Sequence, residues 1–394
     1  MNRLFDKIVA DKRADEARAA GIYPYFHRLE SRQEAVVVME GKRRIMLGSN
    51  NYLSLTSCPE VVEAAIKAVE KYGTGCTGSR FLNGNLDLHL ELERELADFI
   101  GKEDALVFGT GFQTNLGAIS ALVGRHDFVI LDAEDHASIY SAAQMSLGKM
   151  LRFRHNDMAS LEKRLASVPD GAGRLIVVDG VYSTSGDLAD LPSICRLAKK
   201  YDAAVMVDDA HGLGVVGKGG RGTASHFGLD ADVDFVVGTF SKSLASLGGF
   251  VAARREVIDY MRHSSYPFVF SAAVAPASAA SALAALRHLK AHPELPVHLR
   301  GVSDCARKSF AAHGIPLTAA ARDGITPILP IPTGGTVETC VAAKQMFDSG
   351  VFVNAFVPPG VPEGCALIRT SFTATHTPEL IEEASEIIAK ALKC

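Results

Sequence analysis

Between residues 104 and 243 the chain alternates short apolar runs with segments of helical spacing. The apolar runs lie at 104–110, 127–136, 150–156, 174–183, 203–212 and 233–243, and the helical segments at 115–124, 138–148, 158–168 and 193–202. Apolar strands that alternate with helices predict a mainly parallel sheet covered by helices on both faces. In this pattern the run at 233–243 closes the series.

The pattern of predicted elements changes after about residue 290. A helical segment at 302–317 and a proline-rich stretch at 325–335 lead into a strand-and-helix pattern over 365–392. We therefore predict an α/β protein with three parts: an N-terminal arm over 1–58, a large domain over 59–290 and a smaller C-terminal α/β domain over 291–394.

A glycine-rich loop resembles a dinucleotide-binding fingerprint. Gly73, Gly75 and Gly78 have the spacing G-x-G-x-x-G. That fingerprint binds a pyrophosphate only where a strand leads into the loop and a helix follows it. Here the preceding residues, 58–72, have helical spacing after Pro59. The loop is therefore expected to make a sharp turn or allow a close approach, and no dinucleotide is predicted.

Composition excludes several function classes. The net charge of −4 and the pI of about 6.4 show no excess of basic residues of the kind that nucleic-acid-binding proteins use. The seven cysteines are scattered without a C-x-x-C pair, which favours reduced thiols over a disulfide framework or a zinc site, so no metal is predicted. The first residues lack the apolar core of a signal peptide, and small and polar residues dilute the run at 269–286. We expect a cytoplasmic protein.

Polar residues follow the ends of five of the apolar runs. Because the carboxyl ends of parallel strands meet at one edge of a sheet, these residues are expected to form a site. They are Thr110, Gly111, Asp135, His136, Ser183, Asp208, His211, Ser241 and Lys242.

Lys242 follows an apolar run and has small and hydroxyl neighbours. A lysine in such a place can have a lowered pKa and form an imine with a carbonyl compound, whereas the alternative is an ordinary surface lysine. Thr239 and Ser241 could donate hydrogen bonds to a phosphate.

Asp208 ends an apolar run three residues before His211. A carboxylate held there suits the ring nitrogen of a pyridinium cofactor, which must stay protonated to accept electrons. Metal ligation by the same pair lacks a third ligand at a suitable spacing. A purely structural turn at the strand end is the other alternative.

His136 could stack on a planar cofactor or act as an acid or base, or it could simply cap a helix. Thr110, Gly111 and Phe112 lie at a strand-to-helix turn, where free N–H groups bind phosphate; an ordinary loop would look the same. Together, a phosphate cradle, a ring cover, a ring-nitrogen partner and an imine-forming lysine indicate pyridoxal 5′-phosphate.

An ordered set of motifs over residues 20–390 resembles the α-oxoamine synthases, which are pyridoxal-phosphate enzymes of the fold-type I aminotransferase superfamily. The motifs are GSNNYLSL at 48–55, GTGCTGSRFLNGN at 73–85, VDDAHGLGVVG at 207–217, GTFSKS at 238–243 and VPPGVPEGCALIRTSFTATHT at 357–377. The resemblance implies a homodimer with active sites at the subunit interface, and it places the glycine-rich loop near the partner subunit.

The resemblance also implies residue roles. Lys242 would bind the cofactor as an imine and move protons, and Asp208 would pair with the ring nitrogen. His211 and Ser183 would face the ring hydroxyl, and His136 would stack on the ring. The phosphate would lie near Thr110, Gly111, Phe112, Thr239 and Ser241, with Ser271 of a second subunit. Asn50 and Arg369 would hold the amino-acid carboxylate.

Members of this family condense an amino acid with an acyl thioester and release CO₂. The stretches 21–26, 46–55, 77–84 and 238–250 look most like the bacterial branch that uses L-serine and a long-chain acyl-CoA to make a 3-ketosphinganine-type product. The alternatives are the members that use L-alanine with a pimeloyl thioester, the glycine users, a plain aminotransferase and an inactive structural homologue. A long acyl chain needs only an apolar channel, whereas a pimeloyl carboxylate needs a cation.

The N-terminal stretch AAGIYPYF at 19–26 bears on this choice, because in the pimeloyl enzymes the corresponding region supplies the cation. Here the stretch contains no cation, although Arg18, His27 and Arg28 lie next to it. Two further partners stay open: an acyl carrier protein in place of coenzyme A, and a peripheral contact with a membrane.

Overall fold

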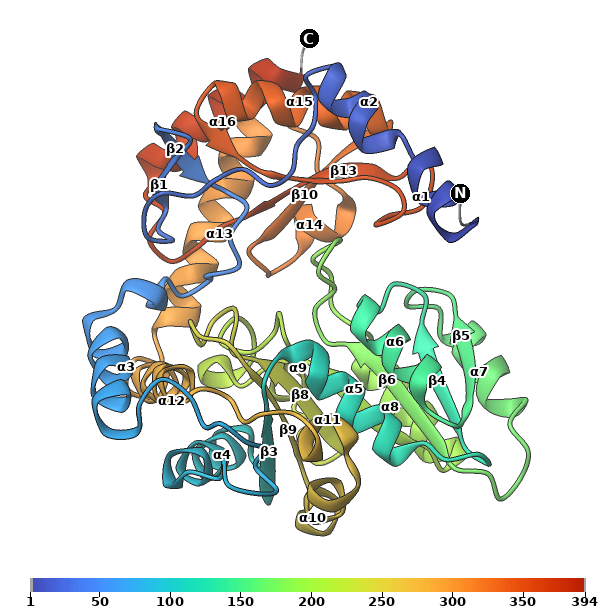
Figure 1. Cartoon of the computed structure of the whole chain (residues 1–394). Coiled ribbons are helices and arrows are strands. Elements are labelled where there is room, and N and C mark those ends of the chain that lie inside the picture. Colours follow the sequence, from blue (N-terminus) through green and yellow to red (C-terminus); the bar gives the residue numbers. More distant parts are fainter. Residues whose placement is uncertain (1–2, 393–394) are drawn as a thin grey trace.

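A seven-stranded sheet forms the centre of the larger part of the molecule in the computed structural model, which describes residues 3–392 (Figure 1). The strand order is β3-β9-β8-β7-β6-β4-β5. The strands are β3 (Asp104–Phe108), β4 (Phe128–Asp132), β5 (Lys149–Phe153), β6 (Arg174–Asp179), β7 (Ala204–Asp208), β8 (Phe235–Thr239) and β9 (Gly249–Ala253).

The prediction of a mainly parallel sheet is confirmed, with one strand missed. Strands β4 to β8 pair in parallel, whereas β9 pairs antiparallel with both β3 and β8. The run at 233–243 therefore does not close the series. Strand β9 is short, and its glycine and alanine residues gave little strand signal in the sequence.

Alternate side chains of each strand enter two separate apolar cores. In β3, Ala105 and Val107 pack on one face of the sheet, and Leu106 and Phe108 pack on the other. The first face is covered by α3 (Pro59–Tyr72), α4 (Asp87–Ile100), α7 (Met158–Ala166), α8 (Leu191–Tyr201), α9 (Thr223–Phe227) and α12 (Pro276–Ala291). The second is covered by α5 (Gly111–Leu122), α6 (Ala137–Met145), α10 (Arg255–Ser264) and α11 (Tyr266–Val269).

A second, smaller part brings the N-terminal region onto the C-terminal region, at the top of Figure 1. One of its three-stranded sheets has the order β1-β2-β11 and the other has the order β10-β13-β12. The strands are β1 (Val36–Met39), β2 (Lys42–Met46), β10 (Ile328–Gly334), β11 (Val351–Phe352), β12 (Asn354–Phe356) and β13 (Ala366–Ser371). The helices of this part are α13 (Leu295–Ala312), α14 (Ala319–Asp323), α15 (Thr336–Asp348) and α16 (Pro378–Leu392).

This smaller part has its own apolar core. Ile45 of β2 is buried there with Phe310 of α13 and Ile368 of β13. Residues of the predicted arm therefore share a core with residues beyond 290. The boundaries at residues 58 and 290 stay predictions.

The N-terminal segment begins with two short helices, α1 (Arg3–Ala10) and α2 (Arg13–Ala19), and short 3₁₀ turns lie at Leu55–Ser57 and Lys218–Gly220. As predicted, a helix, α3, leads into the glycine-rich loop. None of the helices in the described part of the chain combines the length and the apolar composition needed to cross a bilayer.

Candidate active site

A cavity of about 220 Å³ lies at the carboxyl edge of the seven-stranded sheet. Five strands contribute to it through the residues that end them or follow them, as the sequence predicted. The lining includes Thr110, Gly111, Phe112, Asn115, His136, Ser138, Asp179, Asp208, His211, Thr239, Ser241 and Lys242. Most of the proposed cofactor-binding residues therefore lie around one cavity.

Lys242 is the cationic side chain in this lining. Its amine has lost much of its hydration, and this desolvation lowers its pKa to about 8, against the opposing charges of Asp208 and Asp179. A lysine with this pKa is partly neutral near physiological pH. A neutral amine can attack a carbonyl group or accept a proton, so the site gives Lys242 the chemistry expected of it.

Asp208 is held in one orientation by hydrogen bonds to both carboxylate oxygens. The side-chain amide of Asn115 donates to Oδ2 over 2.6 Å, and the backbone N–H of Ala210 donates to Oδ1 over 3.0 Å. The same amide nitrogen of Asn115 also donates to the hydroxyl of Ser138, over 2.9 Å. Asp208 and Asn115 are both buried. The carboxylate is therefore fixed at the end of β7, where it can face a positively charged ring nitrogen.

His136 is positioned by a second carboxylate, Asp179. The backbone N–H of His136 donates to Asp179 over 3.0 Å, and the ring Nδ1 lies 2.7 Å from the hydroxyl of Ser138. Desolvation lowers the pKa of His136, and the charge of Lys242 adds to this effect while that of Asp208 opposes it. The ring is exposed toward the cavity. His136 thus presents a mainly neutral ring at neutral pH.

Asp135 joins two neighbouring strands behind His136. Its carboxylate accepts the backbone N–H of Asp132 and that of Asp179, each over 2.9 Å. Burial and the nearby carboxylates raise the pKa of both Asp135 and Asp179 well above their usual range. Asp135 therefore fixes the ends of β4 and β6 and does not reach the cavity lining.

His211 connects the cavity to a network from the smaller part. Its ring Nδ1 lies 2.7 Å from the hydroxyl of Tyr52, and Arg369 donates to that hydroxyl over 3.1 Å and to the side-chain oxygen of Asn50 over 3.0 Å. Burial lowers the pKa of His211 well below its usual value, and the charges of Lys242 and Arg369 act in the same direction. The network places a buried guanidinium near the cavity.

Arg369 has unused hydrogen-bonding capacity. Its Nε lacks a partner among the described residues although it is buried. A carboxylate binds best to two donors of one guanidinium. This free donor is therefore consistent with a receptor for a carboxylate, as proposed for Asn50 and Arg369.

The opposite end of the cavity suits a phosphate. Helix α5 begins there, and Thr110 caps it by accepting the backbone N–H of Gln113 over 3.0 Å. A Cβ on Gly111 would lie 2.8 Å from the hydroxyl oxygen of Thr239, so glycine permits the close approach of the start of α5 to the end of β8. Free N–H groups at a helix start and the hydroxyls of Thr239 and Ser241 can bind an anion. The residues present fit a phosphorylated pyridine.

Two of the predicted cofactor-binding residues lie outside this lining. Ser183 is on the loop after β6, and Ser271 lies 3.5 Å from the side-chain amide of Gln113, next to the start of α5. Their proposed roles stay predictions.

The sequence reasoning also missed four residues of the site. Asp179 ends an apolar strand just as Asp208 does, so the same rule could have found it. Tyr52 lies two residues after Asn50, but its hydroxyl gave no pattern. Asn115 and Ser138 lie on buried helix faces without any signal in the sequence.

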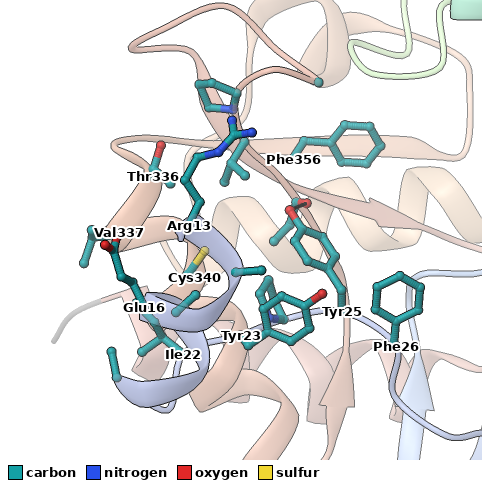
Figure 2. Close-up of a pocket in the computed structure, with 18 of the residues that line it drawn as sticks. Arg13, Glu16, Ile22, Tyr23, Tyr25, Phe26, Thr336, Val337, Cys340 and Phe356 are labelled. Carbon is teal, nitrogen blue, oxygen red and sulfur yellow. Dashed lines mark hydrogen bonds between the residues drawn. The ribbon is translucent and has the colours of Figure 1, made fainter. Parts of the chain in front are cut away.

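A second cavity, of about 1270 Å³, lies between the N-terminal segment and the smaller part (Figure 2). Its lining is rich in aromatic and aliphatic side chains, among them Ile22, Tyr23, Tyr25, Phe26 and Phe356. The hydroxyl of Tyr25 donates to the carbonyl of Ala355 over 3.3 Å, which connects the segment to β12. Asn354, also in the lining, pairs with Arg369 across β12 and β13. One wall of the apolar cavity is thus the strand that pairs with the strand carrying Arg369.

The cations near this cavity are engaged by other groups. Arg13 is the cationic residue among the described lining residues, and it binds Asp11 through two nitrogens, over 2.6 and 2.9 Å.

The three cations that flank residues 19–26 have partners too. Arg18 pairs with Asp15 over 2.9 Å, and its guanidinium lies 4.5 Å from the centre of the Tyr23 ring. His27 contacts Glu40 and Arg28 contacts Glu30, over 2.9 and 2.7 Å.

Comparison with known proteins places this arrangement among described families. The profile of the family "Aminotransferase class I and II" matches residues 42–388. A serine palmitoyltransferase of Sphingobacterium spiritivorum is 47% identical over 99% of this chain and 97% of its own length. An 8-amino-7-oxononanoate synthase of Thermoanaerobacter pseudethanolicus is 37% identical over 100% of this chain and 99% of its own.

Among solved structures, the serine palmitoyltransferase of S. paucimobilis with a bound PLP–myriocin aldimine superposes with a TM-score of 0.94. It is 36% identical, and the match covers 99% of this chain and 97% of that one. The similarity thus extends through both parts of the fold.

Proposed function

This chain belongs to the class I and II aminotransferase family, in its α-oxoamine synthase branch, and we propose that it condenses L-serine with a long-chain acyl-CoA. The products would be a 3-ketosphinganine-type α-oxoamine, coenzyme A and CO₂. The enzyme is a pyridoxal-phosphate-dependent acyltransferase.

The observation that carries the proposal is the meeting of two kinds of site along one strand pair. The polar cavity contains Lys242 and adjoins the network of Arg369. The wall of the apolar cavity includes Asn354, the partner of Arg369 in the β12–β13 ladder. An amino acid and an acyl chain could bind next to each other in this arrangement.

Pyridoxal phosphate, when bound, supplies an electron sink for the charge that develops at the amino-acid Cα. Asp208, held by Asn115, would face the ring nitrogen and keep it protonated. Lys242 would take the Cα proton and later return one, because its pKa of about 8 lets it exist in both forms near neutral pH. His136 would cover the ring and orient the reacting carbonyl oxygen.

Arg369 and Asn50 would hold the carboxylate of the amino acid. The buried guanidinium has a free Nε, and its contacts with Tyr52 and Asn50 fix its plane. Fixing the carboxylate would also fix which bond to Cα stands perpendicular to the plane of the cofactor ring, and this alignment would decide which bond reacts.

The apolar cavity would bind the acyl chain, and its charges favour a long alkyl chain over a pimeloyl chain. Burial of a chain stabilises the complex by about 0.8 kcal/mol for each methylene. Burial of an unpaired carboxylate costs several kcal/mol. Because Asp11 neutralises Arg13 and the lining also contains Glu16, the described lining offers no free cation to a terminal carboxylate.

A homodimer with active sites at the interface is part of the proposal. Large apolar side chains are exposed at the cavity mouth and near the glycine-rich loop: Phe81, Leu82, Phe112, Leu247, Tyr266 and Phe270. An apolar surface of this kind is typical of an interaction site. A second subunit would cover it and could supply Ser271 to the phosphate. A cytoplasmic location would suit the scattered cysteines.

A substrate panel tests this function. Glycine, L-alanine and L-serine are each combined with acetyl-, pimeloyl- and palmitoyl-CoA, and thiol release and product mass are recorded. L-serine with palmitoyl-CoA should give the highest kcat/KM. A preference for L-alanine and pimeloyl-CoA would overturn the proposal, and keto-acid formation without thiol release would indicate an aminotransferase.

A further inference from the structure

A cluster of metal-ligating side chains lies on the outside of the larger part, away from both cavities. Cys58 comes directly before α3, Glu60 lies in the first turn of that helix, and His288 lies near the end of α12. One ligand atom from each of the three lies within 4.8 Å of the others. The Nδ1 of His288 is 2.8 Å from a carboxylate oxygen of Glu60 and 4.0 Å from the sulfur of Cys58.

A second imidazole, a possible fourth ligand, lies beside His288. His292 follows His288 by four residues, and the centres of the two imidazole rings are 4.4 Å apart. The Nδ1 of His292 contacts Glu294 over 3.0 Å. Metal-binding histidines commonly use one ring nitrogen for the metal and the other for a carboxylate, which fixes the ring. The contact with Glu294 is of this kind.

We propose that Cys58, Glu60 and His288 bind one Zn²⁺ ion at the junction of α3 and α12, and that His292, beside His288, or a water molecule completes the coordination. A thiolate, a carboxylate and an imidazole are ligand types that zinc binds, and three protein ligands leave one position of its tetrahedron for this fourth ligand. An ion pair between Glu60 and His288 would explain their contact, but it gives no reason for a thiol and a second imidazole at the same place. The proposed ligands come from two segments far apart in sequence, near 58–60 and 288–292, so no sequence spacing could reveal the site.

Such an ion would tie together segments that are more than two hundred residues apart. The segment before Cys58 carries Asn50 and Tyr52, which contact Arg369 beside the polar cavity. A ligand that binds only the folded chain stabilises it. Zn²⁺ would therefore fix the end of this segment, where it leaves the contacts with Arg369 and enters α3.

Cobalt(II) is the probe for the test, because a tetrahedral Co²⁺ site with a thiolate ligand has intense visible bands. The protein loaded with pyridoxal phosphate is dialysed against a chelator, freed of it and titrated with CoCl₂ in a reducing buffer. We expect visible bands that saturate at one ion per chain and disappear when ZnCl₂ is added. Octahedral, weakly coloured cobalt, or binding without saturation at one equivalent, would overturn the proposal.

Variants assign the ligands. Cys58→Ser should abolish the sulfur-to-cobalt charge-transfer band, and His288→Gln should weaken zinc binding by at least about tenfold in calorimetry. Cys305→Ser is the matched control for a partly buried thiol, and His313→Gln for a histidine paired with a glutamate; both should bind as the unmodified protein does. Unchanged bands in Cys58→Ser, or loss of binding in a control, would contradict the assignment. The readout is independent of the proposed reaction.

Discussion

The two cavities differ in size, polarity and origin. The polar cavity is about 220 Å³ and is built from strand ends within one sheet, so its groups are fixed by the backbone. The apolar cavity is about 1270 Å³ and is formed by an N-terminal segment lying against loops and strands far away in sequence. Part of its wall is held by aromatic packing, in which Tyr23 lies against Tyr25 and Phe26.

This contrast separates chemistry from selectivity. A reacting proton must be placed within a few tenths of an ångström, which needs carboxylates and amines held by hydrogen bonds, as Asp208 is by Asn115. An alkyl chain only needs to leave water, and an apolar wall of suitable shape is enough for that. Changes at the first cavity should therefore reduce turnover for every substrate, whereas changes at the second should alter the choice of acyl chain.

The largest effect is expected from Lys242→Ala. This change removes the amine that we propose binds the cofactor and moves the proton, so turnover should fall by at least about 10³-fold with every acyl-CoA. Steady-state rates with short and long thioesters test this, and circular dichroism controls for folding. Retention of substantial turnover would exclude the proposed role of Lys242.

Asp208→Asn should come next. The substitution keeps the hydrogen bond from Asn115 possible but removes the negative charge, so we expect kcat to fall about 10²-fold for short and long chains alike. The absorbance of the bound cofactor should also change its pH dependence. A decrease in kcat confined to long-chain substrates would contradict the separate roles proposed for the two cavities.

The pH dependence of cofactor uptake tests whether the amine of Lys242 is desolvated in the polar cavity. The neutral form of Lys242 attacks the aldehyde, and its pKa is about 8. The rate at which cofactor-free protein takes up pyridoxal phosphate should rise about tenfold for each pH unit up to 8 and level off above it, because deprotonation is then complete. Stopped-flow absorbance measures this. A rate that continues to rise to pH 10 would mean that the amine is not desolvated.

The smallest effect is expected at the apolar cavity. Ile22→Arg places a cation in the aromatic wall, so kcat/KM for palmitoyl-CoA should fall about tenfold while that for acetyl-CoA stays unchanged. The preference for pimeloyl-CoA should rise by a similar factor, because its carboxylate gains a partner. Val297→Arg, at a position that is 72% exposed on α13, serves as the matched control. An equal loss with acetyl-CoA would show that the two cavities are not separate.

Much of the fold could be predicted because strong patterns repeat along the chain. Apolar strands such as Phe128–Asp132 and Phe235–Thr239 are buried on both faces and read as continuous runs. Strand β9 was missed, because its glycine and alanine residues carry little local signal and one of its two partners, β3, lies far away in sequence. The joining of β2 to β11 could not be predicted for the same reason.

The polar cavity was largely predictable, since one topological rule brings the ends of parallel strands together. It correctly gathered Thr110, His136, Asp208 and Lys242 around one cavity. It could not predict Asn115 or Tyr52, because their roles depend on tertiary contacts of otherwise ordinary helix and loop positions. For the apolar cavity, the sequence indicated only that residues 19–26 contain no cation. The shape of the cavity depends on tertiary contacts and is seen only in the structure.

The pairing of Asn354 with Arg369 restricts how this protein could acquire other substrates. Neighbouring residues on a strand point to opposite sides, so a slip of one position would turn Arg369 away and present Ile368 or Thr370 in its place. An insertion within β13 would thus remove Arg369 from its contacts with Asn50 and Tyr52, and with them the proposed amino-acid site. New acyl preferences are expected to arise by exchange of individual side chains, or by lengthening the turn over 357–365, where the ladder is not constrained.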